Sequence, residues 1–328
     1  MKKKMIKAGI IGASGYTGSE LIRLLLLHPD VDISFVNSST YTKKKVSDVF
    51  NDLIGETELV FSNKINNSVD VIFLCSGHKK SIKFLAENNI ANETKIIDLS
   101  QDFRNNNYDE NSKRKFIYGL PEINKTKISK SSNIANPGCF ATAILLGLIP
   151  SFLNKISSGE VYVNAITGST GAGILPTNKT HNSWRNNNIS WYKPFEHQHL
   201  NEINNTINQI SNNHNKLNLI TYRGSFTRGI FCTAYYETHM EENEIIDIYK
   251  DYYKNHSFVY VSENEIDLKN VINTNKCLIH LIKKDNKILI TSVIDNLIKG
   301  ASGQAIQNLN IMFGIDEKKG LKLKGLIY

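Results

Sequence analysis

The stretch Ile6-Lys7-Ala8-Gly9-Ile10-Ile11-Gly12-Ala13-Ser14-Gly15-Tyr16-Thr17-Gly18 decides the expected fold of this chain. Its mostly apolar first half predicts a buried strand, and glycines follow at every third position. Residues 19–27 then predict a helix that ends before Pro29, because proline cannot continue it. A second strand over residues 32–37 completes a strand–helix–strand unit. In this setting the glycines allow a tight turn and a close approach of the backbone to a pyrophosphate.

Strands and helices keep alternating beyond this unit. Residues 70–75 and 95–100 predict two further apolar strands with polar ends, and residues 80–87 predict a helix between them. Alternation of this kind predicts an α/β fold with a parallel, doubly wound sheet. Ligands of such sheets bind at the carboxyl ends of the strands.

The second half of the chain predicts a different arrangement. Strands are expected at residues 161–166, 217–222, 229–238, 277–282 and 288–294. They indicate a second, α+β domain, and a helical segment over residues 295–313 closes the chain. Between the first two of these strands lies a long polar stretch, residues 167–195, and loops of that length are usually functional or disordered.

The composition is that of a globular protein. The chain of 328 residues is 41% hydrophobic, and its apolar runs are far shorter than the roughly 20 residues of a membrane helix. The net charge of +8 comes from lysines spread along the chain without a nucleic-acid-binding motif, so neither a membrane nor a nucleic acid is expected as a partner. Residues 1–5 are basic but show no signal-peptide pattern, and the cysteines are scattered. We therefore expect a cytoplasmic protein with free thiols.

The end of the second strand favours NADP over NAD. An NAD site would place Asp or Glu there to bind the ribose hydroxyls, whereas this chain has Asn37-Ser38-Ser39-Thr40. Lys43, Lys44 and Lys45 follow closely. Hydroxyl and ammonium groups accommodate a 2′-phosphate, although each lysine alone also fits a solvated turn.

Cys139 lies in Asn136-Pro137-Gly138-Cys139, at the head of an apolar run that predicts a helix. In the first turn of a helix, free backbone N–H groups and the helix dipole favour a thiolate. A lone cysteine beside an apolar helix is more often a small buried hydrophobe, so the position alone leaves both interpretations open.

The segment His197-Gln198-His199-Leu200-Asn201-Glu202 offers an acid–base group. If a helix begins here, His199 and Glu202 share one face, and the carboxylate can orient the imidazole for proton transfer. The His-x-His spacing also suits a metal, but no third ligand is identifiable, so no metal is predicted.

Two further patterns can serve binding. The string Gly168-Ser169-Thr170-Gly171-Ala172-Gly173 allows close approach to a ligand and equally fits a flexible turn. Arginines at Arg104 and in the segment 223–229 match the geometry of carboxylate and phosphate, although each alone is more often a surface ion pair.

Taken together and in order, these strings resemble the N-acetyl-gamma-glutamyl-phosphate reductases of arginine biosynthesis across nearly the whole chain. Besides the stretches already quoted, the resemblance rests on residues 98–104, Tyr118-Gly119-Leu120-Pro121-Glu122, Arg228-Gly229-Ile230 and residues 295–305. The family usually has Arg and Pro where this chain has Gln198 and Asn201, and residues 174–191 are unusual for it. The acyl group on the substrate, whether acetyl, succinyl or another, is left open.

The resemblance implies a Rossmann domain that binds NADP (1–138 plus 296–328) and a catalytic and dimerisation domain (139–295). It implies a homodimer or homotetramer that reduces a small acyl phosphate to a semialdehyde through a thioester on Cys139, with His199 and Glu202 also catalytic. The cofactor residues are expected to be Gly12, Ser14, Gly15, Tyr16, Thr17, Gly18, Ser38, Ser39, Ser76, Gly77, Ser100, Gly171 and Asn296. The substrate residues are expected to be Arg104, Asn136, Gly168, Ser169 and Arg228. The alternatives are a reductase of an N-succinyl or carrier-protein-linked substrate, an aspartate-semialdehyde dehydrogenase, or an NADP-binding regulator without catalysis.

Overall fold

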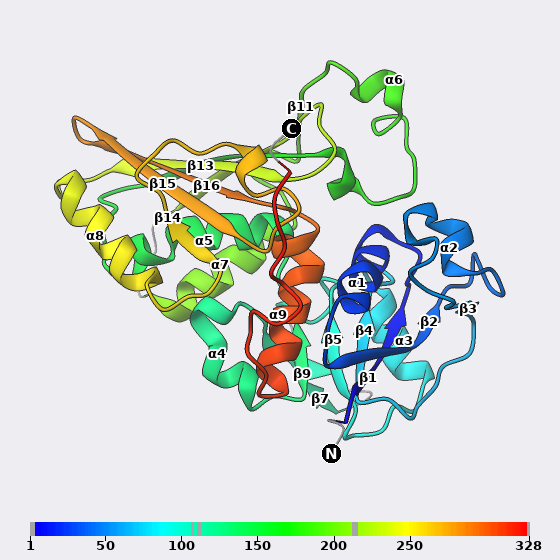
Figure 1. The fold of residues 1–328 in the computed structure, drawn as a ribbon. Coiled ribbons are helices and arrows are strands. Elements are labelled where there is room, and N and C mark those ends of the chain that lie inside the picture. Colours follow the sequence, from blue (N-terminus) through cyan, green and yellow to red (C-terminus); the bar gives the residue numbers. More distant parts are fainter. Residues whose placement is uncertain (1–3, 106–107, 110–112, 212–215, 327–328) are drawn as a thin grey trace. The chain divides into compact units, whose positions relative to one another are not determined.

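The computed structural model describes residues 4–105, 108–109, 113–211 and 216–326 (Figure 1). It divides into two compact units, the first formed by residues 1–138 and 301–322 and the second by residues 139–300 and 323–328. These units differ from the expected domain ranges at residues 296–300 and 323–328, which group with the second unit. Residues 1–3 of the basic N-terminal segment lie outside the described ranges.

The first unit contains a seven-stranded sheet in the order β3-β2-β1-β4-β5-β9-β8, and every pair of neighbours is parallel. This confirms the predicted doubly wound sheet. Its elements are β1 (Ile6–Ile11), α1 (Tyr16–Leu26), β2 (Val31–Asn37), α2 (Val46–Val49), η1 (Asn51–Leu53), β3 (Phe61–Ser62), β4 (Val71–Leu74), α3 (Lys80–Glu87), β5 (Lys95–Asp98), β6 (Tyr108–Asp109), β7 (Arg114–Lys115), β8 (Ile117–Tyr118), α4 (Pro121–Ser129), β9 (Asn133–Ala135) and α9 (Gly303–Met312).

One sequence expectation for this unit was wrong, and several of its elements were not predicted. Helix α1 begins at Tyr16 rather than at residue 19, because the extended backbone of Gly15 precedes it directly and the third glycine lies inside the helix. Helix α4 and strands β8 and β9 were not predicted. The sequence of α4 is mostly polar, so it carries no apolar period, although Pro121 at its start is a typical first helical residue.

Helix α9 is buried along its whole length although it carries several amide side chains. The Asn308 side chain donates to the carbonyl of Gly119 (2.9 Å), and the Asn310 side chain donates to the carbonyl of Lys319 (2.8 Å). Buried polar groups are tolerated when they have such partners. The expected helix over residues 295–313 consists of two parts in the structure, because a π-helical turn, η4 (Ile298–Ser302), precedes α9.

The second unit contains a mixed sheet in the order β11-β12-β10-β13-β16-β15-β14. This confirms the second α+β arrangement, while the polar stretch 167–195 contains short elements that the sequence did not indicate. The elements are α5 (Cys139–Leu153), β10 (Val161–Thr167), η2 (Ser169–Ala172), α6 (Asn182–Arg185), β11 (Ser190–Tyr192), α7 (His199–Ile210), β12 (Leu217–Arg223), β13 (Ile230–Glu237), α8 (Glu242–Tyr253), β14 (Val259–Val261), η3 (Leu268–Asn270), β15 (Cys277–Lys284) and β16 (Lys287–Ile294).

Helix α5 is the central helix of this unit and packs against β13, β16 and α7 (Figure 1). Pro150 within it has no N–H, so the carbonyl of Leu146 loses its usual helical partner. The hydroxyl of Tyr253 donates to that carbonyl (2.5 Å), and Tyr249 donates to the carbonyl of Gly147 (2.7 Å). In the described part of the chain, no helix is long and apolar enough to span a membrane.

Candidate active site

The glycine loop of the first unit has the geometry of a dinucleotide-binding turn. Gly12 has a positive φ of 74°, and a Cβ there would lie 2.7 Å from the backbone nitrogen of Ser76. A Cβ on Gly18 would lie 2.6 Å from the Cα of Ala13, so this glycine lets the helix pack on the turn. A Cβ on Gly15 would make only an ordinary contact, 3.7 Å from the carbonyl oxygen of Gly12, and Gly15 directly precedes α1. The loop therefore leaves room for a pyrophosphate at the start of an 11-residue helix.

Next to this loop, the end of β2 presents hydroxyl groups and lysines. Ser38 is buried and its hydroxyl lies 2.8 Å from that of Ser14, whereas Ser39 is exposed. Lys45 forms an ion pair with Glu58 (2.7 Å), and the ammonium of Lys44 lies 5.7 Å from the ring centre of Tyr41. No acidic side chain stands at the end of the strand, so this site lacks the usual ligand for the ribose of NAD.

The polar ends of β4 and β5 follow at the same edge of the sheet. Gly77 is exposed and has a positive φ of 91°. Ser100 is buried, and its hydroxyl donates to Asp98 (2.8 Å). Burial raises the pKa of Asp98 to about 6, while hydrogen bonds from Ser81 and Ser100 oppose the rise. The predicted cofactor residues Ser76, Gly77 and Ser100 thus lie after neighbouring strands, but the Ser100 hydroxyl already has a protein partner.

Arg104 and Asn136, the substrate residues predicted in the first unit, both hold the backbone. The Arg104 guanidinium donates to the carbonyls of Asn136 (2.8 Å) and Leu99 (3.0 Å). The amide of Asn136 donates to the carbonyl of Ala301 (3.1 Å) and accepts from Asn308 (3.0 Å). These contacts anchor the segment immediately before Cys139, and the substrate roles of both residues stay predictions.

In the second unit, Cys139 is the first residue of α5. It is partly exposed, whereas Cys232 and Cys277 are buried. Burial raises the pKa of the Cys232 thiol, so this residue is an inert core thiol. Cys139 thus combines access with a place in the first turn of a helix.

His199 is likewise the first residue of its helix, α7, which packs against α5. Both His199 and Glu202 are buried, three residues apart in α7. The ring centre of Phe140 lies 5.1 Å from that of His197 and 6.2 Å from that of His199. The first turns of α5 and α7 therefore bring the predicted nucleophile and the predicted acid–base residue into one region.

His197 is a neutral support for this region. Burial, with smaller contributions from Lys193 and Arg223, lowers its pKa to about 4. Its Nδ1 accepts a hydrogen bond from the backbone N–H of His199 (3.2 Å). His197 therefore stays uncharged at neutral pH and helps to fix the start of α7.

Replacing His197 by glutamine should weaken the acid sensitivity of folding. Between pH 6.5 and 4 the unfolded chain protonates this histidine and the folded chain does not, so wild-type stability falls as the pH falls. Between pH 7 and 4.5 the free energy of unfolding of the variant, measured in urea, should fall by roughly 2 to 3 kcal/mol less than that of the wild type. Equal losses in the two proteins would contradict the assignment.

The glycine-rich turn of the second unit lies along the segment 226–229. The N–H groups of Ser169 and Thr170 donate to the carbonyls of Phe226 (2.8 Å) and Thr227 (3.1 Å). A Cβ on Gly168 would lie 2.6 Å from the carbonyl carbon of Thr227. This glycine is required by the close approach of two backbone segments.

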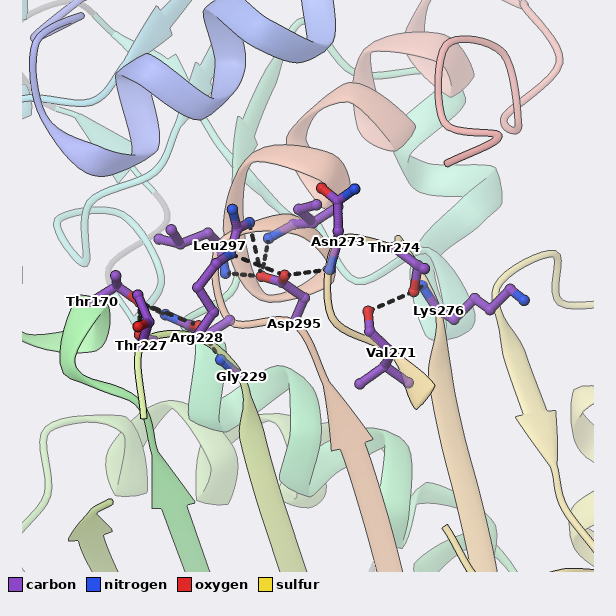
Figure 2. Close-up of polar contacts among 12 residues, drawn as sticks. Thr170, Thr227, Arg228, Gly229, Val271, Asn273, Thr274, Lys276, Asp295 and Leu297 are labelled. Carbon is purple, nitrogen blue, oxygen red and sulfur yellow. Dashed lines mark hydrogen bonds and ion pairs between the residues drawn. The ribbon is translucent and has the colours of Figure 1, made fainter. Parts of the chain in front are cut away.

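Asp295 and Asn296 connect this turn to the segments around it, and Figure 2 shows the contacts of Asp295 with Arg228 and Leu297. The Asp295 carboxylate accepts hydrogen bonds from the N–H groups of Leu297 (2.8 Å) and Asn273 (2.8 Å) and pairs with the Nε atom of Arg228 (3.1 Å). Asn296 accepts from the N–H of Gly229 (2.6 Å) and donates to Thr170 (3.1 Å). The predicted ligand-binding residues Arg228 and Asn296 therefore have structural contacts, and their binding roles stay predictions.

Gly300, in the π-helical turn η4, packs directly on Cys139, the predicted nucleophile. A Cβ at this position would lie 2.9 Å from the Cβ of Cys139 and 3.3 Å from its Cα. Real Cβ atoms do not approach so closely, and the atoms they would meet lie next to the main chain and cannot swing away. Any side chain at position 300 must therefore move Cys139.

Gly300→Ala should lower kcat by about a hundredfold, because a displacement of roughly 1 Å at a reacting group has an effect of that size. Circular dichroism should show an intact fold. Gly159→Ala is the matched control, since nothing lies within 4 Å of a Cβ there. A Gly300→Ala enzyme as active as the Gly159→Ala enzyme would refute this role.

Among the residues that the structure describes, no three His, Cys, Asp or Glu side chains form a metal-binding group. The chemistry that the second unit presents is a partly exposed cysteine at a helix start, with a histidine–glutamate pair on the adjacent helix. The first unit presents a glycine loop whose geometry fits a dinucleotide. A dinucleotide loop in one unit and a helix-start cysteine with a histidine and a glutamate in the other are features typical of oxidoreductases.

Family comparisons identify the class. A family model described as "Semialdehyde dehydrogenase, NAD binding domain" matches residues 7–131, and one described as "Semialdehyde dehydrogenase, dimerisation domain" matches residues 139–296. The chain therefore has the two domains of the semialdehyde dehydrogenase class, the first of which binds a nicotinamide cofactor. Within that class it belongs to the N-acetyl-gamma-glutamyl-phosphate reductase family, as its relatives show.

A reductase of that name from Phocaeicola vulgatus is 52% identical over 322 residues, which cover 98% of this chain and 99% of the relative. One from Flavobacterium johnsoniae is 52% identical over 321 residues, with the same coverage. Among solved structures, aspartate semialdehyde dehydrogenase II from Vibrio cholerae superposes with a TM-score of 0.74 at 17% identity, covering 95% of this chain and 99% of that one. At that identity the likeness concerns the fold alone.

Proposed function

We propose that this protein catalyses the nicotinamide-dependent reduction of N-acetyl-gamma-glutamyl phosphate to the semialdehyde, with release of phosphate. The relatives that carry this name match the chain from end to end at about half identity. We assign the catalytic roles to Cys139 and His199 because they are the first residues of two helices that pack together. An aspartate-semialdehyde dehydrogenase is disfavoured, because the solved enzymes of that name share only the fold.

In the proposed mechanism the Cys139 thiolate attacks the carbonyl carbon of the acyl phosphate. The N–H groups at the start of α5 stabilise the oxyanion, and the C–O bond to phosphate breaks as phosphate leaves with the electron pair. A thioester on Cys139 remains. The N–H groups and the helix dipole at the start of α5 favour the thiolate that this step requires.

The bound nicotinamide cofactor supplies the hydride that reduces the thioester carbonyl. His199 donates a proton to the oxygen as the thiohemiacetal forms and takes it back as the C–S bond breaks. The products are the aldehyde and the Cys139 thiolate. Glu202, buried on the same helix, is proposed to orient the imidazole.

The purified protein should show this activity in reverse. Given NADP, phosphate and N-acetylglutamate semialdehyde, it should reduce the cofactor in a phosphate-dependent way. Aspartate semialdehyde and N-succinylglutamate semialdehyde serve as comparison substrates. No turnover with any semialdehyde would support a regulator without catalysis, and a faster rate with aspartate semialdehyde would overturn the proposed substrate.

We further propose NADP as the cofactor, with Ser39, Lys43 and Lys44 facing its 2′-phosphate. The double variant Lys43→Gln/Lys44→Gln should raise the KM for NADP about tenfold, because hydrogen bonds to charged groups are lost. The KM for NAD should not change. Lys45→Gln is the matched control, since its ammonium is paired with Glu58. Equal effects on both cofactors would contradict this assignment.

We also propose that the protein is a cytoplasmic homodimer or homotetramer. Four exposed apolar side chains lie directly opposite one another across β10, β13, β16 and β15, on one face of the second sheet: Tyr162, Tyr235, Leu289 and Ile282. The rings of Tyr162 and Tyr235 stack at 5.3 Å. A row of this kind fits burial against a second copy, and the matching family model is described as a dimerisation domain.

A further inference from the structure

Two arginines of the second unit lie beside one another near the catalytic helices. Arg185 ends α6, and Arg223 ends β12. Arg185 belongs to residues 174–191, and Arg223 pairs with Ser190 of the same stretch across β11 and β12. The sequence singled out the segment 223–229, which contains Arg223, but Arg185 was not predicted, because nothing in the sequence shows that the two arginines meet.

Arg185 is the unusual member of the pair. Only 5% of the residue is exposed. Its Nη2 donates to the carbonyl of Gly224, but its Nε and Nη1 are buried with no hydrogen-bond partner among the described residues. Leaving such donors unpaired is costly, because desolvation of the charge is not offset. The remaining donors of this buried guanidinium are satisfied only when an anion accepts hydrogen bonds from them.

Arg223 supplies a second positive charge at the same place. Its guanidinium carbon lies 4.3 Å from the ring centre of Tyr192, the last residue of β11. The two arginines lie close together, because Arg185 donates to the carbonyl of Gly224, the residue after Arg223. In keeping with this, burial and then the charge of Arg223 lower the pKa of Arg185. In the described chain no carboxylate forms an ion pair with either of them. The pair is therefore electrostatically uncompensated.

Tyr192 connects the arginines to the nucleophile. His197 packs on the ring of Phe140, the residue after Cys139, with the ring centres 5.1 Å apart. Burial and then the charge of Cys139 raise the pKa of Tyr192. Its ring centre is 5.6 Å from that of His197. The charges that act on Arg185 are those of Arg223 and Tyr192. Contacts therefore lead from Arg223 to Tyr192, from Tyr192 to His197 and from His197 to Phe140, the residue after Cys139.

We propose that Arg185 and Arg223 form a subsite for a carboxylate of the substrate, bound while the reacting carbonyl is attached to Cys139. This inference rests on the proposed function. The leaving phosphate is bonded to the reacting carbonyl itself and must lie at Cys139. The substrate carboxylates lie several bonds further away, which suits a pair of cations beyond Tyr192. The carboxylate is either the α-carboxylate or one that ends the acyl group.

The test measures binding and turnover in Arg185→Met and Arg223→Lys enzymes, with Arg23→Met as control because Arg23 is paired with Asp52 on the surface of the first unit. In the reverse reaction phosphate and semialdehyde are separate substrates. Arg185→Met should raise the KM for the semialdehyde about ten- to a hundredfold and leave the KM for phosphate unchanged. A rise confined to phosphate, or no change in either, would overturn the proposal.

Two semialdehydes distinguish the carboxylates. If the α-carboxylate is bound, Arg185→Met raises the KM for the N-acetyl and the N-succinyl semialdehyde by the same factor. If a carboxylate on the acyl group is bound, only the KM for the N-succinyl semialdehyde rises. Either result supports the subsite and identifies its occupant.

Two further measurements separate this proposal from the proposed function. Calorimetry with N-acetylglutamate, N-succinylglutamate and inorganic phosphate as probes tests the subsite even if the wild type proves inactive. Arg185→Met should also melt at the same or a higher temperature than the wild type, since an unpaired buried charge is removed. A lower melting temperature with unchanged probe binding would identify Arg185 as merely structural.

Discussion

Replacing Cys139 by serine should lower the phosphate-dependent activity by roughly a thousandfold or more while leaving the fold intact. A serine hydroxyl is not ionised at neutral pH, and the helix start that favours a thiolate does not lower its pKa far enough to ionise it. Mass spectrometry should show an acyl adduct on the wild-type protein incubated with the acyl phosphate, and none on the variant.

Cys277→Ser is the matched control for this experiment. Cys277 is a buried thiol whose sulfur lies 3.4 Å from the hydroxyl of Ser292, so a serine finds a polar partner there. Its activity should remain near that of the wild type. A Cys139→Ser enzyme with full activity would exclude the thioester mechanism.

Replacing His199 by asparagine should lower kcat about a hundred- to ten-thousandfold, the usual contribution of a general acid–base group. The variant should still form the acyl adduct on Cys139 but should turn it over slowly, because the proposed role of His199 lies in the reduction and collapse steps. Rapid-quench measurement of the adduct, with and without reduced cofactor, separates these steps.

The exposed His239 provides the comparison for this substitution, and His239→Asn should leave turnover unchanged. Glu202→Gln should have a smaller effect than His199→Asn, since Glu202 is proposed to act only through the imidazole. If His199→Asn abolished adduct formation but not hydride transfer, the proposed assignment of steps would have to be reversed.

Much of the first unit was predictable because its signals are local. An apolar strand, glycines at every third position and an apolar helix follow one another within the first 27 residues, and each is set by neighbouring residues. Helix α4 escaped prediction because its burial depends on packing against α9 rather than on an apolar period of its own.

The predicted binding residues show the limit of motif reading. The guanidinium of Arg104 and the amide of Asn136 hold backbone carbonyls, and Asn296 holds Gly229 and Thr170. The motif around Arg104 also contains Asp102, whose carboxylate accepts from the N–H of Lys79 (2.6 Å) and from that of Ser81 (3.1 Å) at the start of α3. A motif marks such residues together without separating those that bind a ligand from those that shape the loop.

The sequence by itself therefore determined the parallel sheet, the dinucleotide loop and the two helix starts at Cys139 and His199, because strand, turn and helix signals depend on residues close in the chain. Only the tertiary structure decided that Gly300 packs on Cys139 and that Arg185 and Arg223 meet beside Tyr192. Those contacts join residues dozens of positions or more apart, and their geometry arises from the packing of whole elements rather than from any local pattern.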